Sequence, residues 1–325
     1  MNAAPEERSG AELAEAVNRR LSRAAVVANS AGALVVGAFL VSMPLASDPG
    51  EAGGLLLRNL AFAVPYLLFT LWAGVSWGNA RYQRVHDWLR AGRAPTEGER
   101  QAVLRYPRLF SAIGAFMWGT GALLFALVNA ATNPEVGLVA GVVTLLGGTT
   151  TCALGYLLAE RIERPVVALA LAEGTPTRPV GPGVRTRLTV AWVLATGVPV
   201  LGVIGIGAAD LLGADLDEGA LDASIVFLAA VALGVGLYAT LLAAQSVADP
   251  LAALRGAQAR VRAGEFDARV AVADGSEVGL LAAGFNDMAA GLAERERLRD
   301  LFGRHVGRDV SRAALDDGEL RLGGE

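Results

Sequence analysis

Six long apolar segments, separated by short polar stretches, dominate the first 246 residues of the chain. Numbered as spans 1 to 6, they lie near residues 24–46, 60–80, 109–131, 136–158, 188–209 and 223–246. Each is close to the ~20 residues that an α-helix needs to cross the hydrocarbon core of a bilayer. The pattern therefore predicts an all-α membrane protein with a six-helix transmembrane domain over residues 24–246. Residues 1–23 place Leu13, Val17 and Leu21 on one helical face, which predicts an amphipathic N-terminal helix.

The composition agrees with a membrane protein, since 53% of the residues are hydrophobic and only 18% are charged. All basic residues are arginines, which together with the many alanines and glycines is typical of a GC-rich bacterial genome. Cys152 is the only cysteine, so an intramolecular disulfide is excluded. His86 and His305 are the only histidines, which excludes a histidine-based metal cluster within one chain.

The charges of the loops predict the topology. Arginines are concentrated before span 1 and in the loops between spans 2 and 3 and between spans 4 and 5. The other three loops are short and acidic, with Arg58 as their only cation. The positive-inside rule therefore predicts a multi-pass plasma-membrane protein with both termini in the cytoplasm. Because the outer loops are too short to fold into a sensor domain, any stimulus should act within the membrane or at its edge.

The interiors of the six spans lack Asp, Glu, Lys, Arg and His, which argues against the transport of ions or protons. They are rich in small residues such as Gly137 and Gly141, which let helix backbones approach closely. Pro199, in the glycine-rich span 5, should bend that helix. Tight helix packing is the simplest role for the small residues, and a ligand pocket is the alternative.

Residues 247–295, directly after span 6, predict two short helices joined by an extended connector. In the second helix, apolar residues recur at spacings of 3, 4, 3 and 4, the seam by which a helix packs in a coiled coil. They are Val278, Leu281, Phe285, Met288 and Leu292. The first helix has a seam of the same phase, formed by Val247, Leu251, Leu254 and Val261.

Residues that favour helix ends bound the first of these helices. Pro250 suits a first helical turn, where its missing N–H costs nothing, and Gly264 is suited to end the helix. The connector then has apolar side chains, beginning with Phe266, that can pack against the bundle. An ordinary amphipathic helical hairpin is the alternative, because it would also need residues that end its helices. The order and spacing of several motifs distinguish the two interpretations better than any single motif does.

Four motifs occur in order and with suitable spacing: Pro250-Leu251, Gly264-Glu265-Phe266, Ser276-Glu277-Val278-Gly279 and Phe285-Asn286-Asp287-Met288. Together they resemble a HAMP domain, which carries signals from membrane helices to cytoplasmic output domains. The resemblance implies a parallel four-helix coiled coil. Because one chain supplies only two of the four helices, it also implies a homodimer.

A faint internal repeat precedes the HAMP-like stretch. The segment from Glu163 to Leu169 resembles the segment from Ala248 to Leu254. We interpret the six spans as three duplicated hairpins, of which only the last keeps a complete HAMP-like unit. A chance similarity between segments rich in Ala and Arg is the alternative.

After Leu292 the apolar spacing changes, because the next apolar residues of the seam are Leu298 and Leu301. Such a shift, equivalent to inserting three residues, locally overwinds a coiled coil. Residues 296–325 therefore form a separate segment, which contains the motifs Leu301-Phe302-Gly303-Arg304-His305-Val306-Gly307 and Leu320-Arg321-Leu322-Gly323-Gly324-Glu325.

These two motifs resemble the linker that precedes the catalytic domain of class III adenylate cyclases, with Phe302, Gly303 and Arg304 at its centre. Six spans, a HAMP-like stretch and this linker together resemble the membrane-anchored HAMP adenylate cyclases of actinobacteria. The resemblance implies a following domain that converts ATP to cyclic AMP with Mg²⁺ or Mn²⁺ held by two aspartates. The 325 residues contain no such domain, so we expect no catalytic residue, bound cofactor, metal site or nucleic-acid partner in this chain.

Three other classes of protein remain as alternatives. A HAMP histidine kinase needs a phospho-accepting histidine with characteristic flanks, and His305 lacks them. A chemoreceptor would continue in long heptads and usually has two spans around a sensor domain. A transporter, the least favoured class, needs polar sites within its spans.

The short outer loops and the absence of charge within the spans also bear on the stimulus. We expect a hydrophobic partner, a membrane lipid or a fatty acid, in a pocket between spans 4 and 5. An anionic head group would need a cation at a membrane edge, and the candidates are Arg58, Arg108 and Arg187. The alternative role for these arginines is contact with bulk lipid phosphates or the marking of topology.

Overall fold

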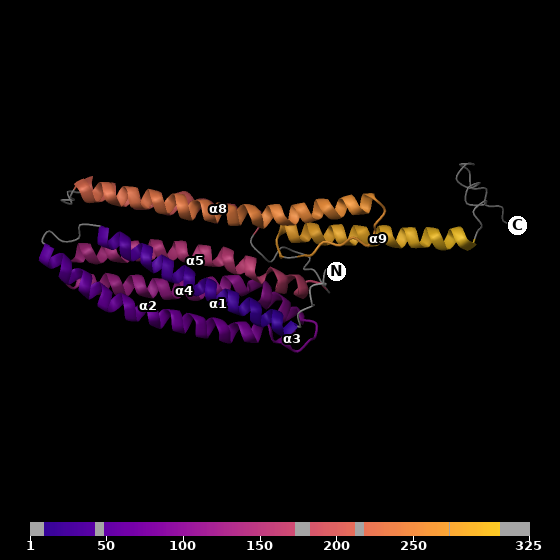
Figure 1. Ribbon diagram of the computed structural model, residues 1–325, viewed down its shortest axis with the longest axis horizontal. Coiled ribbons are helices and arrows are strands. Elements are labelled where there is room, and N and C mark those ends of the chain that lie inside the picture. The colour runs from indigo at the N-terminus through magenta and orange to yellow at the C-terminus, as the bar shows by residue number, and fades with distance from the viewer. Residues whose placement is uncertain (1–9, 43–48, 173–182, 212–217, 273, 306–325) are drawn as a thin grey trace, which may run out of the picture.

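The computed structural model describes residues 10–42, 49–172, 183–211, 218–272 and 274–305 of the chain, and every regular element in these ranges is a helix (Figure 1). In order they are α1 (Gly10–Ser42), α2 (Pro49–Val85), α3 (Asp87–Arg90), α4 (Glu97–Ala130), α5 (Pro134–Ala170), α6 (Val184–Trp192), the π-helical turn η1 (Val193–Gly197), α7 (Val198–Leu211), α8 (Glu218–Arg262) and α9 (Glu277–His305). The predicted all-α class is confirmed.

Within these ranges, six helical segments are long and apolar enough to cross a membrane, as predicted. Spans 1 to 4 are α1, α2, α4 and α5, span 5 combines α6, η1 and α7, and span 6 is α8. The helices extend beyond the apolar segments. In particular, α1 runs from Gly10 through span 1, so the predicted amphipathic helix is the first part of a longer helix. Its apolar face, with Val17 and Leu21, is buried.

Helices α1, α2, α4 and α5 form a bundle, and α8 lies along one side of it (Figure 1). The most extensive contact joins α4 and α5. It depends on small residues, because a Cβ atom at Gly137 would lie 2.6 Å from the Ala126 carbonyl oxygen and 2.6 Å from the Ala130 Cβ. The expectation that glycines permit close helix packing is confirmed at this position. In contrast, α8 packs chiefly on α6 and η1.

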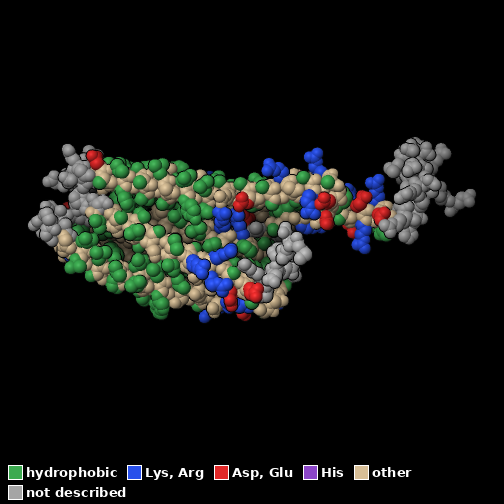
Figure 2. Space-filling model, in the orientation of Figure 1, with side chains coloured by type: hydrophobic (Ala, Val, Ile, Leu, Met, Phe, Trp, Pro, Cys, Tyr) green, Lys and Arg blue, Asp and Glu red, His purple; other side chains and the backbone are tan. Residues whose placement is uncertain are grey.

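The largest cluster of buried apolar side chains lies at the end of the bundle next to α9, which we call the HAMP end. It joins residues of α1 to α5 with residues of α8 and α9. Away from this end, large apolar side chains such as Leu68 and Leu233 are exposed, as lipid-facing residues would be. Figure 2 shows the same division, with hydrophobic side chains over the spans and charged ones gathered toward the HAMP end.

Span 5 is the one irregular span among the described residues, because the π-helical turn η1 interrupts it. Pro199 follows this turn within α7 and has no N–H to donate to the carbonyl one turn earlier. A π-helical turn re-pairs the backbone around such a defect. We expected a bend at Pro199, and the structure has a π-helical turn, a locally widened helix, directly before α7.

Candidate functional site

The segment that resembles a HAMP domain consists of the second half of α8, an extended connector and α9. Both helices run in the same direction, side by side (Figure 1). Gly264 ends the first helical arm with φ +93°, a left-handed conformation that costs a residue with a Cβ about 1–2 kcal/mol. The predicted helix stop at this glycine is confirmed. The connector then returns along α8 to the start of α9.

The protomer buries one face of α9 against α8 and the connector. Val278, Phe285 and Ala289 are buried, together with Val270 and Val272 of the connector. Leu254, Phe266 and Val261 are half-buried at the edge of this core. The connector residues therefore have the packing role that we predicted from their apolar character.

The remaining seam positions form an exposed stripe, which we define as Leu251 of α8 with Leu281 and Met288 of α9. Their exposed fractions are 45%, 54% and 47%. Leu292, farther along α9, is half-buried. The sequence predicted one continuous seam, but the structure divides it between a core within the protomer and this stripe. Heptad spacing alone cannot tell which seam residues are buried within the protomer and which are exposed, because both sets lie on one broad face of the helix.

Asn286 fixes the connector to α9. Its side-chain oxygen accepts a hydrogen bond from the Val270 N–H at 2.9 Å, and its amide donates to the Val270 carbonyl at 2.8 Å. These two bonds satisfy both backbone groups of a residue in an extended segment, where no ladder partner exists. The sequence motif contained Asn286, but its role could not be inferred without the position of the connector.

A second set of polar contacts joins the connector to spans 4 and 5. Arg187, in the first turns of α6, is only 1% exposed and forms ion pairs with Glu160 of α5 and with Asp274 at the end of the connector. The Arg187 Nη2–Asp274 Oδ2 distance is 3.0 Å. We call Arg187, Glu160, Asp274 and the neighbouring Glu277 the connector clamp.

Asp274 is held in place by the turn that begins α9. Its Oδ1 accepts hydrogen bonds from the Ser276 N–H at 3.0 Å and from the Ser276 hydroxyl at 2.6 Å. Burial alone would raise the pKa of the Asp274 carboxyl, but these hydrogen bonds and the charge of Arg187 hold the pKa below its ordinary value. Asp274 is therefore a charged partner for Arg187 at neutral pH.

Glu277, in the first turn of α9, gives the clamp its second contact. Its carboxylate accepts a hydrogen bond from the Val184 N–H at 3.3 Å and so satisfies a free donor at the N-terminus of α6. A Cβ atom at Gly183 would collide with this carboxylate. The beginnings of α6 and α9 are therefore joined directly.

A buried histidine–glutamate pair lies deeper at the HAMP end. The His86 Nε2 lies 3.1 Å from the Glu163 Oε2, and both side chains are fully buried. The His86 Nδ1 faces the Tyr82 carbonyl at 2.9 Å, and the Tyr82 ring stacks on the imidazole. Since each ring nitrogen faces an oxygen, a neutral imidazole can donate to only one of them.

The two segments of the faint repeat lie side by side. Arg164 of α5 forms an ion pair with Asp249 of α8 at 3.7 Å. Arg161, one turn earlier, donates a hydrogen bond to Gln245. The resemblance between the two segments thus coincides with a direct contact between spans 4 and 6 near the HAMP end.

The three arginines proposed for a lipid head group do not share one site. Arg58 donates to Asn129, with an Nη2–Oδ1 distance of 3.2 Å, and to Thr132, at the end of the bundle opposite the HAMP end. Arg108 interacts with Tyr156. Arg187 is enclosed in the connector clamp, so the prediction that it contacts a lipid head group conflicts with its burial.

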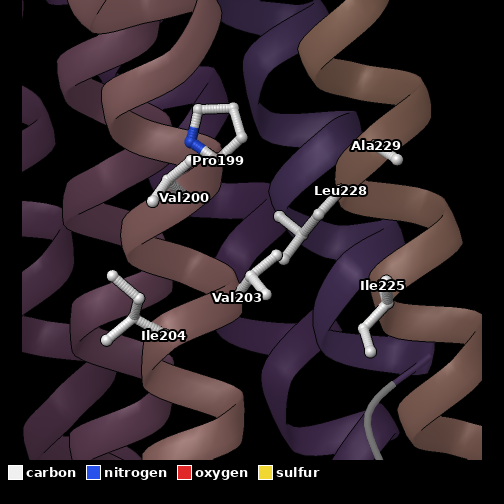
Figure 3. A pocket seen from close by; sticks show the side chains of 7 residues that line it. All are labelled: Pro199, Val200, Val203, Ile204, Ile225, Leu228 and Ala229. Carbon is white, nitrogen blue, oxygen red and sulfur yellow. The ribbon is translucent and has the colours of Figure 1, made fainter.

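An apolar groove of about 210 Å³ lies between α7 and α8 (Figure 3). Its lining residues are Pro199, Val200, Val203, Ile204, Ile225, Leu228 and Ala229. It therefore lies between spans 5 and 6, whereas we expected a pocket between spans 4 and 5. The difference follows from packing, since span 4 is engaged closely with span 3, whereas α7 has α8 as its main neighbour beyond η1.

The linker that we predicted begins in the last turns of α9. The backbone is helical through Phe302, Gly303 and Arg304 up to His305. Residues 306–325, which include the second linker motif, lie outside the described residues. The helix passes from Leu292 to Leu298 without interruption, so the change of spacing breaks the phase of the apolar positions and not the helix itself.

Comparison with known proteins identifies the segment formed by the end of α8, the connector and α9. Residues 242–294 match the HAMP domain family. This stretch is a HAMP domain. Six apolar helices precede it, so the chain is a multi-pass membrane protein with the signal-transducing arrangement of span and HAMP domain. The resemblance that rested on four short motifs is confirmed for this domain.

The chain is also similar to mycobacterial proteins. It is 37% identical over 267 residues to an uncharacterized protein of Mycobacterium tuberculosis, covering 81% of this chain and 49% of that protein. An uncharacterized protein of Mycobacterium bovis is 31% identical over 309 residues, covering 94% of this chain and 53% of that protein. The chain thus spans about half the length of the curated relatives it matches. No solved structure matches it.

Proposed function

We propose that the chain is the membrane anchor and signal-transmitting portion of a receptor that acts on an output domain through its HAMP domain. The continuity of α8 is the observation that carries this proposal. It is a single helix of 45 residues that includes span 6 and the first HAMP helix. Pro250, which we expected in a first helical turn, lies inside this helix, so the helix continues through the junction and can transmit rotation or axial displacement from the span to the HAMP domain.

The active form in this proposal is a parallel homodimer in the plasma membrane, with both termini in the cytoplasm. The exposed stripe supports the dimer, because Leu251, Leu281 and Met288 are apolar side chains on a HAMP surface outside the apolar spans. Packing against the same stripe of a second chain would complete a four-helix bundle. The arginine-rich loops support the topology.

We further propose that the output is a class III adenylate cyclase domain. The linker-like motif at the end of α9 supports this assignment, and the mycobacterial relatives are long enough to include a further domain. Any Mg²⁺ or Mn²⁺ would bind in that domain, and this chain would contribute no catalytic residue. Another HAMP receptor, a histidine kinase or a chemoreceptor, is the alternative. Any coding sequence found downstream of position 325 would distinguish these classes.

Insertions in α9 test the transmission of the signal. In a fusion to a cyclase domain, one residue inserted between Leu292 and Leu298 rotates the downstream helix by ~100°, whereas seven residues restore its phase to within ~20°. We therefore expect the one-residue insertion to change cyclase activity severalfold and the seven-residue insertion to leave it close to that of the parent fusion. Equal activities of the two insertion variants would contradict transmission through the coiled coil.

We propose a lipid or fatty acid as the stimulus, bound in the groove between spans 5 and 6. The groove supports an acyl chain because its lining is entirely apolar and Val203 and Leu228 face one another across it (Figure 3). Each methylene buried there would contribute about 0.8 kcal/mol. Binding would regulate only if it favours one dimer arrangement over another.

A photoreactive fatty acid offered to the purified protein in nanodiscs would test this proposal. We expect labelling of the groove, and Val203→Trp, which fills it, should reduce labelling severalfold. Val226→Trp is a matched control, because Val226 is an exposed residue of α8 that does not line the groove. Equal labelling of both variants would argue against the groove as the binding site.

A further inference from the structure

The two helices of the HAMP domain are connected to different spans. The first is continuous with span 6, because both belong to α8. The second, α9, follows a connector and has no covalent continuity with any span. Its first turn is instead held by the connector clamp to α6, the beginning of span 5.

We propose that the connector clamp makes span 5 a second mechanical input to the HAMP domain, coupled to α9 independently of span 6. Relative movement of spans 5 and 6 would then become relative movement of the two HAMP helices. This inference rests on the proposed function, because it matters only if the HAMP domain transmits a signal. The clamp would connect span 5 to α9 through non-covalent contacts, a connection that the covalent chain does not provide.

The clamp is suited to transmit movement because it is difficult to open. Separating Arg187 from Asp274 would leave a buried guanidinium with one carboxylate fewer and a buried carboxylate without its cation. Glu160 links the same guanidinium to the end of span 4. Arg187 therefore holds two spans and the connector at one point.

The clamp is also rigid on the side of α9. Two hydrogen bonds from Ser276 fix the Asp274 carboxylate. A Cβ atom at Gly279 would collide with the Asp274 carbonyl oxygen, which shows that the end of the connector and the first turn of α9 are in close contact. The Glu277 contact with Val184 is a second, separate attachment. Two attachments three residues apart resist rotation as well as separation.

Span 5 can move relative to span 6 because the two helices differ in construction. The π-helical turn Val193–Gly197, followed by Pro199, interrupts the α-helical bonding of span 5, whereas α8 remains α-helical throughout, including around Pro250. Interruptions of this kind are where helices bend. The apolar groove lies beyond the turn, on α7, so an occupant there would act on span 5 across this interruption.

Hydrogen exchange of the chain in lipid nanodiscs tests the coupling without an output domain. In Arg187→Gln we expect the amides in the first turns of both α6 and α9 to exchange at least about tenfold faster, while those of the first HAMP helix, around Leu254, do not change. The proposal would be overturned if only the α6 amides exchanged faster, or if exchange in neither helix changed.

A reciprocal variant covers the case in which Arg187→Gln does not fold. Asp274→Asn keeps an oxygen for the Ser276 hydrogen bonds and removes only the charge, and it should accelerate exchange at the start of α6, far away in sequence. Two exposed positions supply controls, Arg185→Gln on α6 and Asp287→Asn on α9, and neither should change exchange at the other helix. If Asp274→Asn leaves α6 unchanged, the clamp is not a coupling element.

This outcome can be separated from failure of the proposed function. Suppose that the two insertions in α9 give different cyclase activities but the clamp variants do not accelerate exchange at both α6 and α9. Transmission through the HAMP domain is then supported and the second input is refuted. If the two insertions give equal cyclase activities but the clamp variants accelerate exchange at both helices, the clamp is supported and the proposed function is refuted.

Discussion

Replacing His86 with phenylalanine should lower the free energy of unfolding by about 3 kcal/mol or more. The ring volume is conserved, but Glu163 loses its partner while remaining fully buried, and breaking a buried ion pair from one side typically costs about 3–5 kcal/mol. Glu163 has no compensating contact, because its Oε1 already lacks a hydrogen-bond partner among the described residues. Denaturant unfolding of the protein in mixed micelles would measure the loss.

The double variant His86→Phe with Glu163→Leu should recover most of that loss. Removing both polar groups leaves no unpaired charge, and the Tyr82 carbonyl still accepts from the His86 backbone N–H at 3.0 Å in either variant. Gln83→Phe is the matched control, since Gln83 is an exposed residue of the same helix, and its effect should stay within about 0.5 kcal/mol. A double variant as unstable as the sum of the two single variants would contradict a coupled pair.

The sequence predicted the repeating parts of this structure well. Spans follow from hydrophobic length, and the HAMP domain follows from spaced apolar residues together with Gly264, because each of these signals is local. Pro250 did not mark a helix start, since it lies inside α8. The helix ends also had local signals that could have been used. Thr96 and Glu99 form a capping box at the start of α4, and Asn133 caps α5.

The polar contacts at the HAMP end could not be predicted in the same way, because their partners are distant in sequence. Arg187 meets Asp274 across 87 residues, and His86 meets Glu163 across 77 residues. Glu160 and Glu163 stand beside Arg161 and Arg164 directly after span 4, so the sequence offers each carboxylate a neighbouring arginine and no sign of its distant partner.

The division of the seam shows a further limit of pattern reasoning. Spacing places Phe285 and Leu281 on the same helical face, yet Phe285 is buried within the protomer and Leu281 is 54% exposed. The path of the connector decides between them, because Asn286 fixes Val270 on the Phe285 side of the core. The side of α9 left open by the connector is therefore the side available to a second chain.

Cysteine cross-linking should detect that second chain. In a Cys152→Ser background, Leu281→Cys should form a disulfide-linked dimer in membranes, because residues on the axis of a parallel bundle face their own copies. Adding Met288→Glu should reduce cross-linking at least about tenfold, since two carboxylates would be buried without partners in the same seam. Gel mobility under non-reducing conditions measures the effect.

Ala290→Glu provides the control for the added charge. Ala290 is an exposed residue of α9 that points about 180° away from Leu281, so a carboxylate there remains in solvent and cross-linking at Leu281→Cys should be unchanged. Loss of cross-linking in both glutamate variants would show that charge on α9 acts without a seam. If Leu281→Cys gives no dimer even before a charge is added, the exposed stripe is not the contact between chains, and the HAMP domain would have to transmit its signal through another arrangement.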